Sequence, residues 1–332
     1  MKKEFINVER IEGYIYSTGS GFNQLDERIS GENSKNPGTK YISGDLDIAV
    51  DEDGLNVITI HYTYVTPTYA KSGKSNSTYT VLKRIIDNPE KTWLIGGKEN
   101  AFKVQCTGVS IGLNDFIAGD GKKVSAMRNQ GGFCAIVDEF SKDGDRNKFT
   151  TDMLITKVTH IDADPEKNIQ EDFVTVSGAI FGYGASLPAL LPVSFTVHNP
   201  NGMAYFEGLE PSYQAPVFTK VWGQINCKTI TTVKTEESAF GEAAVQTYER
   251  KSREYVITGT AKVPYDFGDE KVLTEEDVTA MSQARQIMLA EIEKRANENK
   301  ANQAANGISF GEAMATSKPA QQVPVSIGDF KF

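Results

Sequence analysis

Apolar and polar residues alternate along much of the first 265 residues, the pattern of strands with one buried face. The stretch 41–50, YISGDLDIAV, alternates in this way, and so does 55–65, LNVITIHYTYV. An acidic turn between them, 51–54, ends in glycine. Two period-two runs around such a turn predict a β-hairpin.

Further strands are predicted on both sides of a polar connector, SKDGDRNK (141–148), which has no apolar residue. Before the connector they are 5–17, 101–113 and 132–140, and after it they are 149–161, 173–184, 190–199, 202–209, 216–227, 230–235 and 253–263. The segment 78–87, TYTVLKRIID, fits a short helix or a strand. Many short strands favour barrels or sandwiches over a parallel α/β sheet. We therefore predict a mainly β chain with one β domain over 1–140 and another over 149–265.

The pattern changes near the C-terminus. Thr274 and Asp277 have the spacing of a helix capping box, and apolar residues then recur at helical spacing, which predicts a C-terminal helix over 274–298. The segment 299–332 is polar, small and proline-bearing, which predicts a flexible tail. Three apolar residues at its tip are candidates for binding a protein partner: Ile327, Phe330 and Phe332.

Composition is that of an ordinary folded chain, with 39% hydrophobic and 24% charged residues among 332. No apolar run is long enough to span a bilayer, and the N-terminus has no signal-peptide core. The three cysteines form no CxxC pair, so we expect neither a zinc site nor a disulfide framework. These features favour a cytoplasmic protein.

Motifs for catalysis or cofactor binding fail at required positions. A phosphate-binding loop ending at Ser75 would need glycine at 68, where threonine stands. A calcium loop opening at 142 lacks its glycine and its final glutamate. His160, Asp162 and Asp164 have metal-ligand spacing, but a strand end running into an acidic turn before Pro165 is the preferred interpretation. We expect no enzyme activity, no cofactor and no metal.

One window departs from the acidic character of the chain, whose formal net charge is -9. From Gly54 to Ile86 there is no Asp or Glu. The window carries aromatic and cationic candidates for binding nucleic acid: Tyr62, Tyr64, Tyr69, Lys71, Lys74, Tyr79, Lys83 and Arg84. Single-stranded nucleic acid is bound by cations that follow phosphates and by rings on which bases stack. The alternative is a polar hairpin tip with surface tyrosines and lysines for solubility.

A second acid-free window lies between Glu210 and Glu236. Strand alternation places Phe218, Lys220 and Trp222 on one face, and Lys228 follows. This face could stack bases and contact phosphates. Alternatively, Phe218 and Trp222 face the core while Lys220 reaches the edge.

Three stretches resemble single-stranded DNA-binding proteins of the OB-fold, of the kind carried by bacteriophages. FVTVSGAIFGYG (173–184) is similar to the first strand of an OB barrel, FTKVWGQI to an inner strand, and EYVITGTAKV to the closing strand. The resemblance implies two OB-like β-barrel domains. A disordered tail closing in an aromatic residue is also found in such families, where it recruits replication enzymes.

The predicted function is therefore sequence-tolerant binding and protection of single-stranded DNA in replication or recombination. Its partners would be single-stranded DNA and, through the tail, replication or recombination proteins, with no membrane, in the host cytoplasm if the chain is phage-encoded. A structural virion protein, such as a tail or baseplate subunit, is the alternative. A β protein that binds a small ligand is a third possibility.

Overall fold

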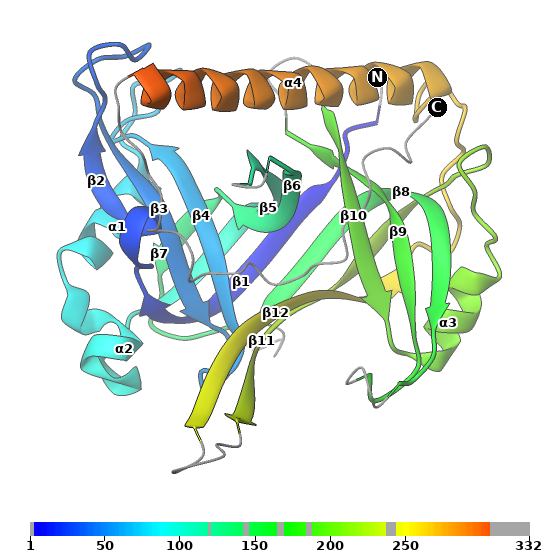
Figure 1. The fold of residues 1–332 in the computed structure, drawn as a ribbon, viewed down its shortest axis with the longest axis horizontal. Coiled ribbons are helices and arrows are strands. Elements are labelled where there is room, and N and C mark those ends of the chain that lie inside the picture. Colours follow the sequence, from blue (N-terminus) through cyan, green and yellow to red (C-terminus); the bar gives the residue numbers. More distant parts are fainter. Residues whose placement is uncertain are drawn as a thin grey trace.

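The computed structural model describes residues 3–118, 121–141, 146–164, 169–183, 188–236 and 244–305. The chain is mainly β, as predicted, and its strands form one continuous sheet (Figure 1). The strands are β1 (Asn7–Ser17), β2 (Asp26–Ile29), β3 (Lys40–Ala49), β4 (Val57–Val65), β5 (Lys103–Ile117), β6 (Lys123–Gln130), β7 (Phe133–Ile136), β8 (Asn147–Ile161), β9 (Phe173–Gly182), β10 (Ala189–Val197), β11 (Val217–Glu236) and β12 (Ala244–Thr260).

Two closed circuits of strands lie within this sheet. In the first, β1, β3, β4, β6 and β5 pair in that order, and β5 returns to β1. In the second, β8, β9, β10, β12 and β11 pair in order, and β11 returns to β8. Numbered by chain position, both read 1-2-3-5-4-1 with one parallel pair each, the order of an OB barrel. The predicted pair of OB-like barrels is confirmed.

Helices connect and cover these barrels. They are α1 (Ser77–Ile86), α2 (Trp93–Gly96), α3 (Pro200–Glu207) and α4 (Glu275–Ala305), with short 3-10 turns η1 (Gly21–Asn23), η2 (Pro89–Lys91) and η3 (Lys98–Asn100). The ambiguous segment 78–87 is mostly helix α1, because the Asn76 side chain accepts a hydrogen bond from the Thr78 backbone N–H and caps it. The strand predicted at 202–209 is wrong: Pro200 at the first turn and the Asn199 cap make this segment α3.

Helix α4 lies across one end of both barrels (Figure 1). It begins where the capping box predicts, since the Asp277 backbone N–H donates to Thr274 Oγ1 at 3.2 Å. Arg285 is almost buried and forms two hydrogen bonds of 2.5 Å to Asp115 on β5, which fix the helix to the first barrel. The helix continues to Ala305, so the predicted helix end at 298 is too early, because alanine favours helix. The remaining tail, with Ile327, Phe330 and Phe332, lies outside the described residues.

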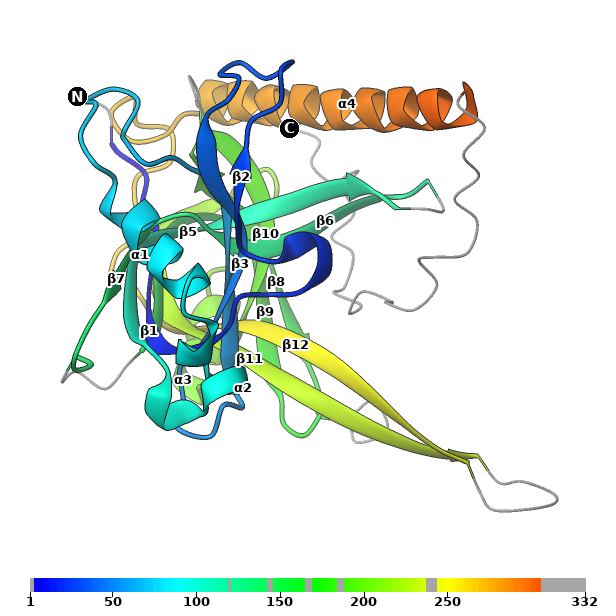
Figure 2. The ribbon, with the colours of Figure 1, turned by 90° about the vertical axis from the view of Figure 1, so that its left-hand side faces the viewer.

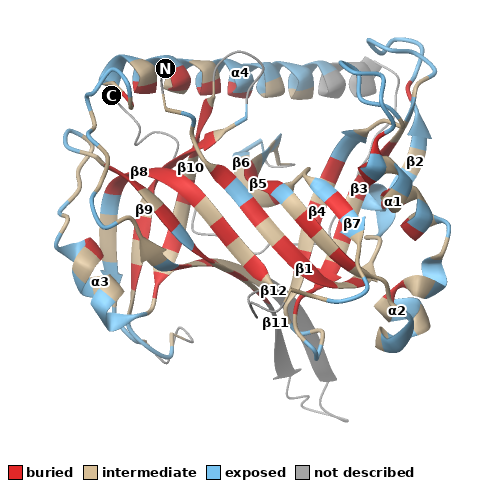
Figure 3. Cartoon of the chain, turned by 180° about the vertical axis from the view of Figure 1, so that it is seen from behind, coloured by how far each residue is buried: buried red, intermediate tan, exposed pale blue. Residues whose placement is uncertain are grey.

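Burial follows the strand alternation (Figure 3). The inner faces of both barrels contribute to one apolar cluster. A second cluster joins the outside of the second barrel to the start of α4, through Phe218, Leu273, Val278 and Met281 among others. Among the described residues, none of the helices has the length and apolar character needed to cross a membrane.

The β11–β12 hairpin extends as an arm from the second barrel (Figure 2). Its pairing is antiparallel from Val221 and Thr260 out to Glu236 and Ala244. Two of the stretches that resemble OB-fold strands lie in this hairpin. FTKVWGQI lies in β11, and EYVITGTAKV contributes the closing strand β12. FVTVSGAIFG is β9, the second strand of its barrel rather than the first, because β8 precedes it.

The two barrels join through β1, which pairs with β8 between Asn7 and Ile11. The Asn7 side chain donates to the carbonyls of Ile111 and Phe181, one in each barrel, at 2.9 and 3.0 Å. This buried amide ties β5 to β9. The division of the chain into domains at 141–148 stays a prediction, since the sheet runs through both barrels without a break.

Glu9 lies where β1 and β8 pair, a contact that we call the seam, and it is fully buried. Neither of its carboxyl oxygens has a hydrogen-bond partner among the described residues. Burial raises its pKa to about 8, against the opposing attraction of Arg253. The folded state therefore holds a proton that the unfolded state loses above about pH 4.5. Stability should fall as pH rises from 4.5 to 8, by at most about 1.4 kcal/mol per pH unit for one group.

We expect Glu9→Gln to remove this pH-dependent loss. Chemical denaturation should show little difference from the natural chain at pH 4, and a stability gain for the variant that grows up to about pH 8. A difference between the two proteins that is the same at every pH would contradict the assignment of the proton to Glu9.

Candidate nucleic-acid interface

In OB-folds, the outer face of the second and third strands often binds oligonucleotides. In the first barrel these strands are β3 and β4, and their outer face carries acids. Asp45 Oδ1 lies 2.6 Å from His61 Nδ1, and Asp47 accepts hydrogen bonds from Thr59 and Ser17. Two carboxylates on this face would repel a phosphodiester backbone.

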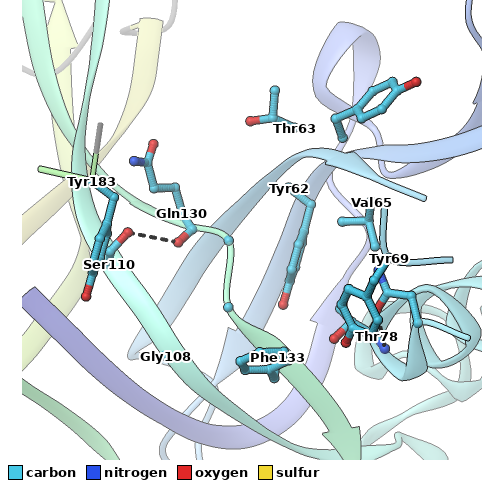
Figure 4. Close-up of a pocket in the computed structure, with 14 residues that line it drawn as sticks. Tyr62, Thr63, Val65, Tyr69, Thr78, Gly108, Ser110, Gln130, Phe133 and Tyr183 are labelled. Carbon is cyan, nitrogen blue, oxygen red and sulfur yellow. Dashed lines mark hydrogen bonds between the residues drawn. The ribbon is translucent and has the colours of Figure 1, made fainter. Parts of the chain in front are cut away.

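A cavity of about 530 Å³ opens instead beside this face, where the two barrels meet. We call it the junction pocket (Figure 4). It is lined by Tyr62, Thr63, Tyr64, Val65, Tyr69, Asn76, Thr78, Gly108, Ser110, Gln130, Gly131, Gly132, Phe133 and Tyr183. None of these lining residues is charged, and several are aromatic. The pocket can therefore accept a flat, uncharged group that has a polar edge.

Phe133 and Tyr183 come from different barrels and are the most exposed rings of the pocket, at 57% and 68%. A turn with positive φ at Gly131 and Gly132 leads into β7 and presents Phe133. A Cβ at Gly108 would lie only 3.6 Å from the Phe133 ring, which packs over this glycine. The Tyr183 hydroxyl donates to the Asn7 carbonyl at 3.2 Å, which holds that ring at the seam.

A small loop carries two cations to the edge of this pocket. The Tyr69 N–H donates to the Lys74 carbonyl at 2.9 Å, and the Gly73 N–H donates to the Tyr69 carbonyl at 2.8 Å. This turn exposes Lys71 and Lys74, while Tyr69 lines the pocket. Neither lysine has an ion-pair partner within the part of the chain that the structure describes. Their charges are available to a ligand.

The other predicted residues of the first window divide by environment. Tyr64 is exposed in the pocket wall, and its hydroxyl lies 3.1 Å from Ser30 Oγ. The base-binding role predicted for Tyr62 is wrong. Its ring lies in the barrel core, where its hydroxyl donates to Cys106 Sγ, so it cannot stack on a base. The face of β4 that it shares with Ile60 is the inner one.

Helix α1 holds the last three residues of this window. The Tyr79 hydroxyl donates to Glu27, and burial together with this hydrogen bond raises the pKa of Tyr79 to about 12. Lys83 is paired with Asp87 at 2.6 Å. The Arg84 guanidinium lies 5.0 Å from the centre of the Phe102 ring. Tyr79 and Lys83 are therefore already occupied by protein partners.

The candidate residues of the second acid-free window lie in different environments. Phe218 is buried in the cluster at the start of α4, so its proposed role in stacking is wrong, and the core interpretation holds for this ring. Trp222 on the same strand is 38% exposed, and its indole covers Gly259, its cross-strand partner. Lys220 is half-buried. The side chain of Lys228 lies outside the described part of the chain.

Sequence reasoning missed Gln130, Phe133 and Tyr183. Each stands on a different element, and they come together only through the pairing of β5 with β6 and β7 and the contact between barrels. The glycines before Phe133 are a local signal of a special turn. Tyr183 lies near the end of the 173–184 stretch that resembles an OB strand, and nothing in that stretch marks its ring as part of a site.

The structure brings together two of the three residues that had metal-ligand spacing in the sequence. His160, Asp162 and Asp172, rather than Asp164, have potential ligand atoms within 4.8 Å of one another, and all three are exposed. His160 Nδ1 lies 2.7 Å from Glu207, and this hydrogen bond raises the pKa of His160. A histidine stabilised in its protonated form is a poor metal ligand, so a strand end running into an acidic turn remains the preferred interpretation.

Gly132→Ala should disturb the pocket through its backbone. The residue has φ of 89°, and a Cβ would lie 2.8 Å from the Thr107 carbonyl oxygen. We expect a loss of stability of about 2–3 kcal/mol in denaturant unfolding, from strain plus this clash. Gly38→Ala is the matched control, because Gly38 has φ of 73° but open space around it. Equal losses at the two positions would contradict the role of close packing at Gly132.

Comparison with known proteins gives a sequence family and a structural likeness. The wild-type single-stranded DNA binding protein from Thermus aquaticus is 10% identical, with a TM-score of 0.44, covering 80% of this chain and 96% of that one. A deletion mutant of the same protein is 12% identical, with a TM-score of 0.43, covering 80% and 98%. No curated protein matches by sequence. The sequence model of the YorF family matches residues 23–295, and the chain therefore belongs to the YorF family.

Proposed function

We propose that the protein binds single-stranded DNA without strong sequence preference. The observation that carries this proposal is the junction pocket: exposed rings around an uncharged cavity, with Lys71 and Lys74 at its edge, neither of them in an ion pair with a described residue. Rings accept bases of any sequence, and cations contact the phosphates between them. A duplex keeps its bases stacked inside, so it could not enter such a pocket.

The charge of the protein sharpens this proposal. A chain of net charge -9 has no general attraction for DNA, so its contacts have to be local. The acidic face of β3 and β4 turns the backbone away, while the 66–76 loop, which has no acid, attracts it. This contrast gives the bound strand a defined path.

The biological setting is part of the proposal. Protection of single strands during replication or recombination, in the host cytoplasm if a phage encodes the chain, is the use that suits sequence-tolerant binding. The tail residues Ile327, Phe330 and Phe332 remain proposed contacts for a replication or recombination protein.

Truncation at Lys300 should leave the affinity for oligo-dT unchanged if the tail binds proteins, and should raise it if the tail competes for the DNA site.

A structural role in a virion is the second candidate. The apolar side chains of Leu55, Leu94 and Ile95 are largely exposed at the β3–β4 turn and at α2, which is an arrangement suited to subunit contacts.

Fluorescence anisotropy with labelled oligo-dT, against a duplex of equal length and at increasing salt, separates the DNA-binding role from the virion role. Tight, salt-sensitive binding of the single strand supports the proposal. No binding at low salt, together with concentration-dependent assembly in sedimentation, would favour the virion role.

Lys71→Glu combined with Lys74→Glu should weaken binding to oligo-dT and lower the slope of log affinity against log salt by about 1.4, the value for two lost phosphate contacts. Lys83→Gln is the matched control, because Lys83 is already paired with Asp87. It should change neither quantity appreciably. An unchanged slope in a folded double variant would show that the loop does not touch the phosphates.

Trp222 remains a proposed stacking residue on the second barrel. Its exposed indole should lose fluorescence when oligo-dT binds, and Trp222→Phe should remove most of that change. Trp93 provides the internal control, since its ring packs beside Tyr14 and Tyr16. Quenching that persists in Trp222→Phe would mean that the bound strand does not reach β11.

A further inference from the structure

We propose that one unstacked base of the bound strand enters the junction pocket between Phe133 of the first barrel and Tyr183 of the second. The strand then crosses from one barrel to the other at this point. This inference rests on the proposed function, and it names the part of the DNA that the pocket takes.

The pocket has the size and chemistry of a site for a small planar group. Its volume of about 530 Å³ lies within the range of sites that enclose small ligands. The wall offers rings for the face of a base and polar groups for its edge. The side-chain nitrogen of Gln130 has no hydrogen-bond partner among the described residues, and Ser110 Oγ makes only a long hydrogen bond of 3.4 Å to the Gln130 carbonyl.

The absence of charge in the lining selects the base over the phosphate. A phosphate inside the pocket would lose its water and meet no cation among the lining residues, at a high cost in free energy. The cations stand outside, at Lys71 and Lys74, in the loop that also holds Tyr69. A base inside and phosphates at the rim is the arrangement that satisfies both groups.

Both rings are positioned before a ligand arrives. The Gly131–Gly132 turn presents Phe133, and the hydrogen bond to the Asn7 carbonyl holds Tyr183. Because Asn7 also joins β5 to β9, the two sides of the pocket are fixed to the same seam. Preorganised rings lose little conformational freedom when a base enters.

A double-mutant cycle tests whether the two rings act on the same base. The natural chain, Phe133→Ala, Tyr183→Ala and the double variant are titrated with oligo-dT of about 16 nucleotides, the upper end of the site size of one OB domain. We expect each single variant to bind about 5- to 150-fold more weakly, the effect of one lost base–ring stack. The loss in the double variant should be clearly smaller than the product of the two single losses.

Ring-preserving variants provide the controls. Phe133→Tyr and Tyr183→Phe should keep most of the affinity. Phe22→Ala removes a ring that is 91% exposed but lies outside the pocket lining, and it should have no effect. Both tested rings are mostly exposed, so their removal should leave the barrels folded, and thermal unfolding checks this.

The outcomes separate the inference from the proposed function. If the affinity loss of the double variant equals the product of the two single-variant losses, the rings contact different bases. That result would overturn the shared site. Unchanged binding in both alanine variants would place the bases elsewhere. An Asp45→Asn variant whose affinity rises while both alanine variants stay unchanged would place the strand on β3 and β4. If the natural chain binds duplex and single strand equally or binds neither, the proposed function fails, and this inference with it.

Discussion

The two-barrel structure depends on the way β1 divides its backbone hydrogen bonds. Glu9 is paired with both Val109 of β5 and Phe149 of β8, and Tyr14 is paired with both Lys103 of β5 and Ala49 of β3. Since a strand has two edges, β8 and β3 share one edge of β1 while β5 occupies the other. Because buried peptide groups need partners, this division fixes where the second barrel stands relative to the first.

The position of the seam decides which faces can be used. It brings β9, with Tyr183 just beyond its end, against β5, and so completes a pocket that the first barrel alone would leave open on one side. The carboxylates at Asp45 and Asp47 lie on the neighbouring strand face. The acidic face of β3 and β4 and the uncharged junction pocket thus lie side by side on the first barrel.

Much of the architecture could be predicted from the sequence, because alternation reports which strand residues are buried. The strands around the 51–54 turn and the capped start of α4 are cases in which local pattern and final structure agree. Alternation does not tell which of two faces is inner, or what covers the outer one. Tyr62 and Phe218 were misassigned for these two reasons: one faces the barrel interior, and the other is covered by the start of α4.

The pocket itself was beyond sequence reasoning. Its rings stand far apart in the chain, at Tyr69, Phe133 and Tyr183, and none lies in a recognisable motif with the others. The acid-free window from Gly54 to Ile86 contributes Tyr64, Tyr69 and the two lysines of the adjoining loop. A local charge signal therefore indicated one side of the candidate site, and only strand pairing supplied the other.

The sharing of β1 also has a consequence for the order of events during synthesis. Residues 7–11 leave the ribosome long before their partners at 147–151, roughly 7 to 30 s earlier at 5–20 residues per second. During that interval the edge of β1 is open to pairing with other chains. Glu9 is ionised in water, and a charge on an unpaired edge discourages such pairing. The carboxyl group that lowers the stability of the folded protein at neutral pH thus places a charge on the edge of β1 before β8 is synthesised.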